Sequence, residues 1–85
     1  MKEFKKVISD PVGLHARPAG LLVKQAAAFK SKVTISGNGK SADGKKLIML
    51  MGLGIRKGME VICRIEGEDE EAASEVLQKF FEENL

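Results

Sequence analysis

The sequence predicts an α+β domain, in which helices pack on one face of an antiparallel or mixed sheet. Strand-like and helix-like segments interleave in the order β-α-β-β-α-β-α. The Gly-Asn-Gly at residues 37–39 is typical of a hairpin turn, because glycine and asparagine tolerate positive φ. A chain of 85 residues is long enough for one small domain, whose core is most readily buried between two layers. We therefore expect a single domain over residues 1–85.

The first half of the chain supplies a strand, a turn and a helix. Residues 2–9 predict a strand with Phe4 and Ile8 on one face, although Lys6 interrupts the alternation. Residues 10–13 predict a turn. Residues 16–29 predict an amphipathic helix, with Pro18 in its first turn, where a missing N–H is tolerated. Its apolar positions recur at steps of three and four: Ala19, Leu22, Val23, Ala26 and Phe29.

The second half supplies three strands and two helices. Residues 33–36 and 40–42 predict the arms of the hairpin. Residues 47–52 predict a short helix followed by a loop, although periodicity alone is also compatible with a buried strand. Residues 60–66 predict a strand. A last helix follows, capped by Asp69 or a neighbour. The residues that we expect to be buried are Val61, Cys63 and Ile65 on the strand, and Ala73, Val76, Leu77, Phe80 and Phe81 on the helix.

The composition argues against several classes of protein. No apolar run approaches the roughly 20 residues of a membrane span, and Met1–Lys6 lacks the apolar region of a secretory signal. The single cysteine, Cys63, cannot form an internal disulfide and is most simply a small buried hydrophobe. Metal sites need several Cys or His at close spacing. We expect a cytoplasmic protein without membrane insertion, metal or cofactor.

The net charge of +2 conceals an asymmetry along the chain. Residues 1–65 carry 13 basic and 4 acidic residues, whereas residues 66–85 carry one basic residue and 8 acidic ones. One interpretation is a solvated acidic face on the last helix. Another is a dipolar molecule that presents a basic face to an acidic partner, which would speed their encounter. The two interpretations are compatible.

The segment Gly13–Ala19 carries the candidate chemistry. It contains the only histidine, His15, at the predicted start of a helix, where free backbone N–H groups and the helix dipole favour an anion such as phosphate. Neutral imidazole is a nucleophile near pH 7, and the guanidinium of Arg17 is a planar donor suited to phosphate oxygens. A single histidine is more often structural than functional, but these flanking residues favour a phosphoryl acceptor.

The rest of the chain lacks the parts of an enzyme that would phosphorylate itself. It has no glycine-rich loop ending in Lys-Ser/Thr for a nucleotide, and no second histidine or catalytic triad. A carrier needs only a site that accepts and donates a phosphoryl group, while partner proteins supply the remaining groups. The sequence therefore favours a carrier over an enzyme.

The apolar run from Leu47 to Ile55 exceeds what one short helix can bury. Part of it is expected either to fill the core or to remain exposed as a docking patch. Its two methionines, Met49 and Met51, and the nearby Met59 suit both roles. Basic residues flank the run and would form a rim around such a patch: Lys45, Lys46, Arg56 and Lys57.

Together with the run through Leu53-Gly54, the segment Gly13–Ala19 resembles HPr, the histidine-containing phosphocarrier family of the bacterial phosphoenolpyruvate-dependent sugar phosphotransferase system. The resemblance covers essentially the whole chain. It implies an open-faced β-sandwich, with a four-stranded antiparallel sheet and three helices on one face. It also implies a protein that shuttles between enzyme I and the IIA domains of sugar permeases. We expect it to be a monomer and not to bind nucleic acid.

The resemblance also assigns roles to residues. It implies that Nδ1 of His15 is phosphorylated, that Arg17 binds the phosphoryl group, and that the N–H groups of Ala16 and Arg17 are donors to it. Partner docking would fall on two helices: on Gly20, Leu21 and Lys24 of the first, and on Leu47, Ile48 and Met51 of the second.

The chain departs from the family at the start of the second helix. Many members have a serine there, which a dedicated kinase phosphorylates to control carbon catabolite repression, whereas this chain has Lys46. Lysine cannot undergo that reaction and reverses the local sign of charge. Met49 and Gly52 also depart from common family residues. These differences are typical of a specialised paralogue, such as one serving a nitrogen-type phosphorelay.

Three other functions are compatible with parts of the sequence. An HPr-like regulatory interaction module would use the same face, with phosphorylation as a switch. A nucleic-acid-binding domain would fit the basic residues, but the chain has no Trp or Tyr for base stacking. A histidine phosphatase would need an acid and more phosphate ligands than Arg17.

Overall fold

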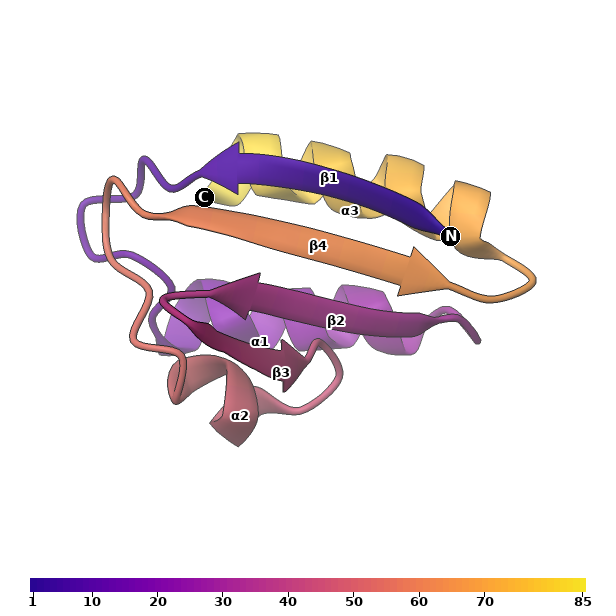
Figure 1. The fold of residues 1–85 in the computed structure, drawn as a ribbon, viewed down its shortest axis with the longest axis horizontal. Helices are drawn as coiled ribbons and strands as arrows, with labels where there is room; N and C mark the ends of the chain where they lie inside the picture. Colours follow the sequence, from indigo (N-terminus) through magenta and orange to yellow (C-terminus); the bar gives the residue numbers. More distant parts are fainter.

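The computed structural model describes residues 1–85 and contains the elements in the predicted order (Figure 1). They are β1 (Lys2–Val7), α1 (Ala16–Ala27), β2 (Lys32–Gly37), β3 (Lys40–Asp43), α2 (Leu47–Met51), β4 (Glu60–Glu66) and α3 (Glu70–Asn84). The predicted boundaries differ from these by at most about two residues, which is the usual uncertainty of element ends.

The strands form one four-stranded antiparallel sheet in the order β1-β4-β2-β3. In the interior strand β4, Cys63 lies opposite Phe4 of β1 and Ile35 of β2. Figure 1 shows α1 and α3 side by side behind the sheet, and α2 beside β3 at its edge. The other face of the sheet carries no helix. The structure confirms the predicted open-faced β-sandwich.

The core lies between the sheet and the helices. The alternation predicted for β4 is confirmed, because Val61, Cys63 and Ile65 are buried whereas Glu60, Arg64 and Glu66 are exposed. Phe81 of α3 meets Phe4 edge-on, with ring centroids 5.1 Å apart. Burial raises the pKa of the Cys63 thiol to about 12, so this cysteine packs as a small hydrophobe, as predicted.

The apolar run from Leu47 to Ile55 is divided between a helix and a loop, as predicted. Within α2 only Leu50 is buried, whereas Leu53 and Ile55 of the following loop reach the core. Met49 and Met51 are exposed, and Met59 is partly buried against the core. Part of the run is therefore left on the surface.

One expectation for α3 was wrong, and another is confirmed only in its position. Val76 is 40% exposed instead of buried, because it faces the groove between α1 and α3, which Leu21 and Phe29 line on the opposite side. Asp69 is the N-cap residue of α3, in agreement with the expectation for Asp69 or a neighbour, but its side chain makes no capping hydrogen bond to that helix. Its carboxylate instead accepts the N–H groups of Lys30 at 2.8 Å and Ser31 at 2.9 Å, and also the Ser31 hydroxyl. Asp69 thus links the start of α3 to the turn between α1 and β2.

Candidate functional site

His15 lies at the N-terminus of α1, as predicted. It is the N-cap residue, with extended backbone angles (φ −96°, ψ −176°), and its carbonyl accepts the N–H of Ala19 at 3.0 Å. Its side chain makes no capping hydrogen bond, and the first turn of α1 has no acidic residue. An imidazole that does not cap its helix is free for other contacts.

The first backbone donors of α1 have no acceptor within the chain. Neither Ala16 nor Arg17 donates its N–H to another residue, and Pro18 has no N–H to donate. The Arg17 side chain is exposed and makes no ion pair. Two free amides and the positive end of the helix dipole therefore directly follow His15 in the chain, and Arg17 carries a free guanidinium, a combination suited to an anion.

The loop before His15 is fixed against the segment that follows α2. Gly13 has φ +78°, and a Cβ at this position would lie 2.8 Å from Cα of Arg56 and would also collide with the carbonyl oxygen of Ile55. Only glycine satisfies both constraints. The N–H of Leu14 donates to the same Ile55 carbonyl at 3.1 Å, and the Leu14 side chain is buried. The backbone that presents His15 is thus held on a packed support.

Asp10 lies beside the imidazole, a contact that was not predicted from the sequence. Its Oδ2 is 3.7 Å from Nε2 of His15, and its Oδ1 accepts the N–H of Val12 at 2.8 Å. A carboxylate in the turn five residues before the histidine was the only signal in the sequence. The contact depends on the path of the loop, which the sequence pattern does not specify.

The residues that the resemblance assigned to partner docking lie on α1 and α2, which pack against each other. All but one are exposed, and Ile48 is 81% exposed; the exception is Gly20, which is half-buried. The exposed residues are Leu21, Lys24, Leu47, Ile48 and Met51. An apolar surface therefore adjoins the helix that begins at His15, and the exposed Met49 extends it.

The expected basic rim is only partly free. Lys46, Arg56 and Lys57 are exposed and make no ion pair. Lys45, in contrast, donates from its ammonium group to the Phe29 carbonyl at 2.7 Å, which satisfies an acceptor just beyond the C-terminus of α1. Lys45 supports the packing of α1 instead of standing free at the rim.

The structure has neither a candidate membrane span nor a candidate metal site. No helix combines the length and the apolar character that crossing a membrane requires. No three His, Cys, Asp or Glu side chains gather closely enough to hold a metal ion.

Comparison with known proteins gives one consistent result. The family described as the PTS HPr component phosphorylation site matches residues 2–83. The phosphocarrier protein HPr of Mycoplasma genitalium is 41% identical over 85 residues, covering 99% of this chain and 97% of that protein. The HPr of Buchnera aphidicola is 47% identical over 73 residues, covering 86% of each. A crystal structure of HPr from Thermoanaerobacter tengcongensis superposes with a TM-score of 0.90 at 38% identity, covering 96% of this chain and 92% of that one.

Proposed function

Because this chain belongs to the HPr family of phosphocarrier proteins, we propose that His15 accepts a phosphoryl group from phosphorylated enzyme I and donates it to a IIA domain for sugar uptake. One observation carries the proposal: the only histidine stands at a helix N-terminus whose first two amides have no acceptor. Family membership makes the chain a carrier, so the chemistry is completed by its partners and not by this chain alone.

Nδ1 is the ring nitrogen that we propose to be phosphorylated. Nε2 faces the Asp10 carboxylate, whereas Nδ1 makes no hydrogen bond within the chain. A phosphoryl group on Nδ1 brings about two negative charges to the start of α1. The N–H groups of Ala16 and Arg17 and the Arg17 guanidinium would stabilise that charge, both in the product and in the transfer transition state.

The partner surface that we propose is the exposed apolar surface on α1 and α2, with the free cations Lys24 and Lys46 beside it. Apolar contacts of this kind supply affinity, and the cations steer an acidic partner into place. We further propose that residues 1–85 act as one cytoplasmic domain and as a monomer. One solved HPr of Thermoanaerobacter tengcongensis is described as a dimer, so sedimentation of this chain in solution tests the monomer directly.

The proposal is tested by following phosphate. Incubation with phosphoenolpyruvate and enzyme I should give a phosphorylated chain whose modification is labile in acid and stable in alkali, and His15→Ala should remain unmodified. The phosphorylated chain should then transfer its phosphoryl group rapidly to a IIA domain. Modification of the alanine variant would contradict the assignment of His15, and a stable phosphorylated chain that no IIA domain discharges would favour a regulatory module.

Lys46 favours a specialised branch of the family as a second candidate. It is the exposed N-cap residue of α2, where the resemblance places the regulatory serine. We expect an HPr kinase with ATP to leave this chain unmodified, as judged by mass spectrometry, because lysine offers no hydroxyl. A phosphoserine on any tryptic peptide of α2 or its flanks would contradict this. Faster transfer to a nitrogen-type IIA domain than to a sugar-type one would identify the specialised phosphorelay.

A further inference from the structure

Asp10 is the one acidic side chain that the structure places beside the imidazole. Its Oδ2 lies 3.7 Å from Nε2 of His15, and the two side chains are 24% and 36% exposed. Two cationic residues have their backbone close to the site: Arg17 in the first turn of α1, and Arg56, whose Cα packs against Gly13. The Asp10 carboxylate attracts a proton on the ring, whereas the free amides and cations of the site attract a phosphoryl group.

The carboxylate of Asp10 is held in place by its own turn. Oδ1 accepts the N–H of Val12 at 2.8 Å, which forms a local side-chain-to-backbone turn. The backbone N–H of Asp10 donates to the Leu85 carbonyl oxygen at 3.1 Å, and both the N–H and the hydroxyl of Ser9 donate to the same oxygen. With Oδ1 occupied and the backbone anchored, Oδ2 remains directed at the imidazole.

We infer that Asp10 is a positioning residue, which keeps the imidazole proton on Nε2 and so leaves the lone pair of Nδ1 free for phosphoryl transfer. A neutral imidazole carries its proton on one nitrogen only, and a nearby carboxylate favours the tautomer whose N–H points toward it. In metal sites, a carboxylate beside the second nitrogen of a ligating histidine fixes the tautomer of the ring in the same way. This inference rests on the proposed function and adds to it the group that selects the reacting nitrogen.

The chemistry requires the Nε2 proton in both directions. On acceptance, the Nδ1 lone pair forms the N–P bond while the bond from phosphorus to the donor breaks and its electron pair stays with the donor. The ring then carries Nε2–H and a positive charge, which the Asp10 carboxylate stabilises. On donation, the N–P electron pair returns to Nδ1, and the ring leaves as neutral imidazole because Nε2 has kept its proton. Asp10 therefore favours the form that both accepts and releases the group.

The variant Asp10→Asn removes the charge and keeps an oxygen that can accept the Val12 N–H. Asp43→Asn is a matched control, because Oδ1 of Asp43 accepts the N–H of Lys45 at 2.9 Å in the same kind of turn. Asp43 lies near the C-terminal end of α1, where Lys45 contacts Phe29, and so is remote from His15. Both variants lose one carboxylate charge, but only one of them loses it beside the imidazole.

The first measurement is the tautomer of His15 by nitrogen NMR of the unphosphorylated chain, at a pH where the ring is neutral. Because the chain has one histidine, the ring signals need no further assignment. We expect Asp10→Asn to lower the ratio of the Nε2–H to the Nδ1–H tautomer by about twofold to fivefold, the size of a partly exposed charge contact, and Asp43→Asn to leave it unchanged. An unchanged ratio in Asp10→Asn would overturn the inference.

The second measurement is the rate of donation from phosphorylated His15 to a IIA domain across pH. At about pH 8 the Asp10→Asn rate should be lower than the wild-type rate by about threefold, and the deficit should close toward pH 6, where solvent protons keep Nε2 protonated without the carboxylate. A deficit that is equal at every pH would show a merely structural role. If the wild-type chain accepted no phosphoryl group, the proposed function would be contradicted. The tautomer measurement would still test the role of Asp10, because it uses the unphosphorylated chain.

Discussion

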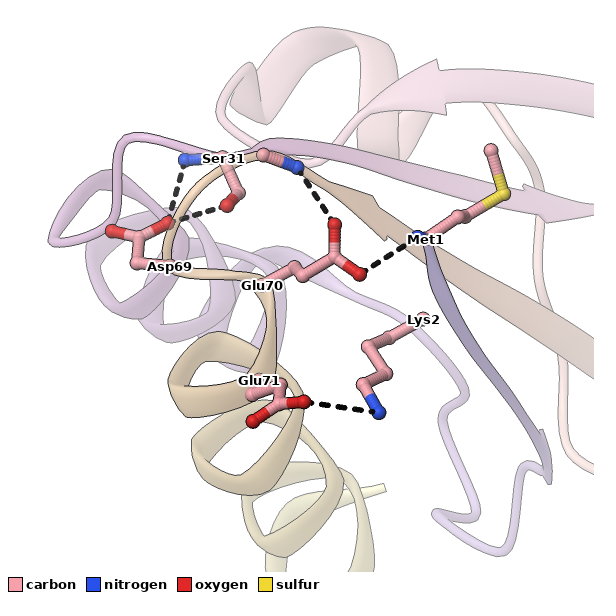
Figure 2. A network of polar contacts seen from close by, with 7 residues as sticks. Met1, Lys2, Ser31, Asp69, Glu70 and Glu71 are labelled. Carbon is pink, nitrogen blue, oxygen red and sulfur yellow. Dashed lines mark hydrogen bonds and ion pairs between the residues drawn. The ribbon is translucent and has the colours of Figure 1, made fainter.

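The two long helices of this protein begin in opposite ways. At the start of α3, Glu70 and Glu71 occupy the first turn, where negative side chains stabilise the positive end of the helix dipole. The Glu70 carboxylate accepts the Gly67 N–H at 3.2 Å and lies 2.7 Å from the Met1 amino group (Figure 2). At the start of α1 no acidic residue is present in the first turn, and the side chain of His15 makes no capping hydrogen bond. The positive dipole at the start of α3 is thus balanced by carboxylates of the chain, whereas that at the start of α1 is not.

The start of α3 therefore contributes to stability, whereas the start of α1 is available to a ligand. The hydrogen bond from the Met1 amino group, together with that from Gly67, holds the pKa of Glu70 below its usual range, so its carboxylate stays charged where α3 needs it. Ala16 and Arg17 leave the corresponding charge of α1 unmatched. Local rules of helix capping are often broken where a ligand completes the arrangement. We propose that the phosphoryl group is the acceptor that is missing at the start of α1.

The largest effect is expected from Arg17→Ala. Loss of a charged hydrogen-bond donor to phosphate costs about 2 kcal/mol, or about 30-fold in the rate of phosphoryl transfer. Stability should hardly change, because Arg17 is exposed and makes no ion pair. Transfer kinetics and thermal unfolding check the two halves of this prediction.

Arg64→Ala is the matched control, because Arg64 is an exposed arginine on β4 that pairs with Glu3 at 2.8 Å. It should leave transfer unchanged. If Arg17→Ala lost transfer and stability in parallel, Arg17 would be a structural residue and the comparison between the two helix termini would fail.

A smaller effect is expected from Ala16→Glu, which makes the start of α1 resemble that of α3. A carboxylate in the first turn should stabilise the helix by about 0.5 kcal/mol and raise the Tm by about 3 °C. The same charge should repel the phosphoryl group and slow its transfer by about tenfold. Calorimetry and transfer kinetics should therefore change in opposite senses.

The control is Ala72→Glu, which adds a carboxylate to the exposed first turn of α3, where Glu70 and Glu71 already lie. It should neither stabilise the fold appreciably nor slow transfer. A gain of stability in Ala16→Glu without any loss of transfer would show that the open terminus of α1 does not hold the phosphoryl group.

The smallest effect on transfer is expected from Asp69→Asn, which should act on stability alone. The hydrogen bond from the Ser31 hydroxyl, followed by those from the backbone of Lys30 and Ser31, holds the pKa of Asp69 below its usual value of 3.8. Because the pKa is lower in the folded state, the carboxylate stabilises the fold above about pH 4, and this contribution is lost as the pH falls through the folded-state pKa.

Asp69→Asn should therefore have a lower Tm than the wild type at neutral pH, and the difference should shrink in acid. Glu75→Gln is the control, since Glu75 is exposed, lies beyond the first turn of α3 and makes no ion pair, and it should leave the Tm nearly unchanged. A difference in Tm for Asp69→Asn that did not depend on pH would contradict the ionic account.

The sequence was sufficient for most of the fold, because its signals were local. Helical periodicity located α1, β-branched alternation located β4, and Gly-Asn-Gly located the hairpin, in which Asn38 has φ +53° and Gly39 has φ +75°. The placement of His15 before Pro18 likewise followed from rules of helix termini. Each of these features depends on residues close together along the chain.

The errors concern contacts between distant segments. Asp69 or a neighbour was predicted to cap α3, but the Asp69 carboxylate accepts hydrogen bonds from Ser31, 38 residues away, instead of from its own helix. Val76 fits the apolar stripe of α3, yet its burial depends on how closely α1 packs there. The contact between Asp10 and His15 could not be predicted, because it depends on the path of the loop between them, which packs against Ile55. A sequence pattern specifies which face a residue occupies, but not which distant group meets that face.

The most direct test of the open helix terminus is the amide spectrum of the chain before and after phosphorylation by enzyme I and phosphoenolpyruvate. We predict that the backbone N–H protons of Ala16 and Arg17 shift downfield more than any others, because each gains a charge-assisted hydrogen bond to a phosphoryl oxygen. If phosphorylated His15 left these two protons unmoved while other amides shifted, the α1 terminus would not be the binding site, and the account would be contradicted.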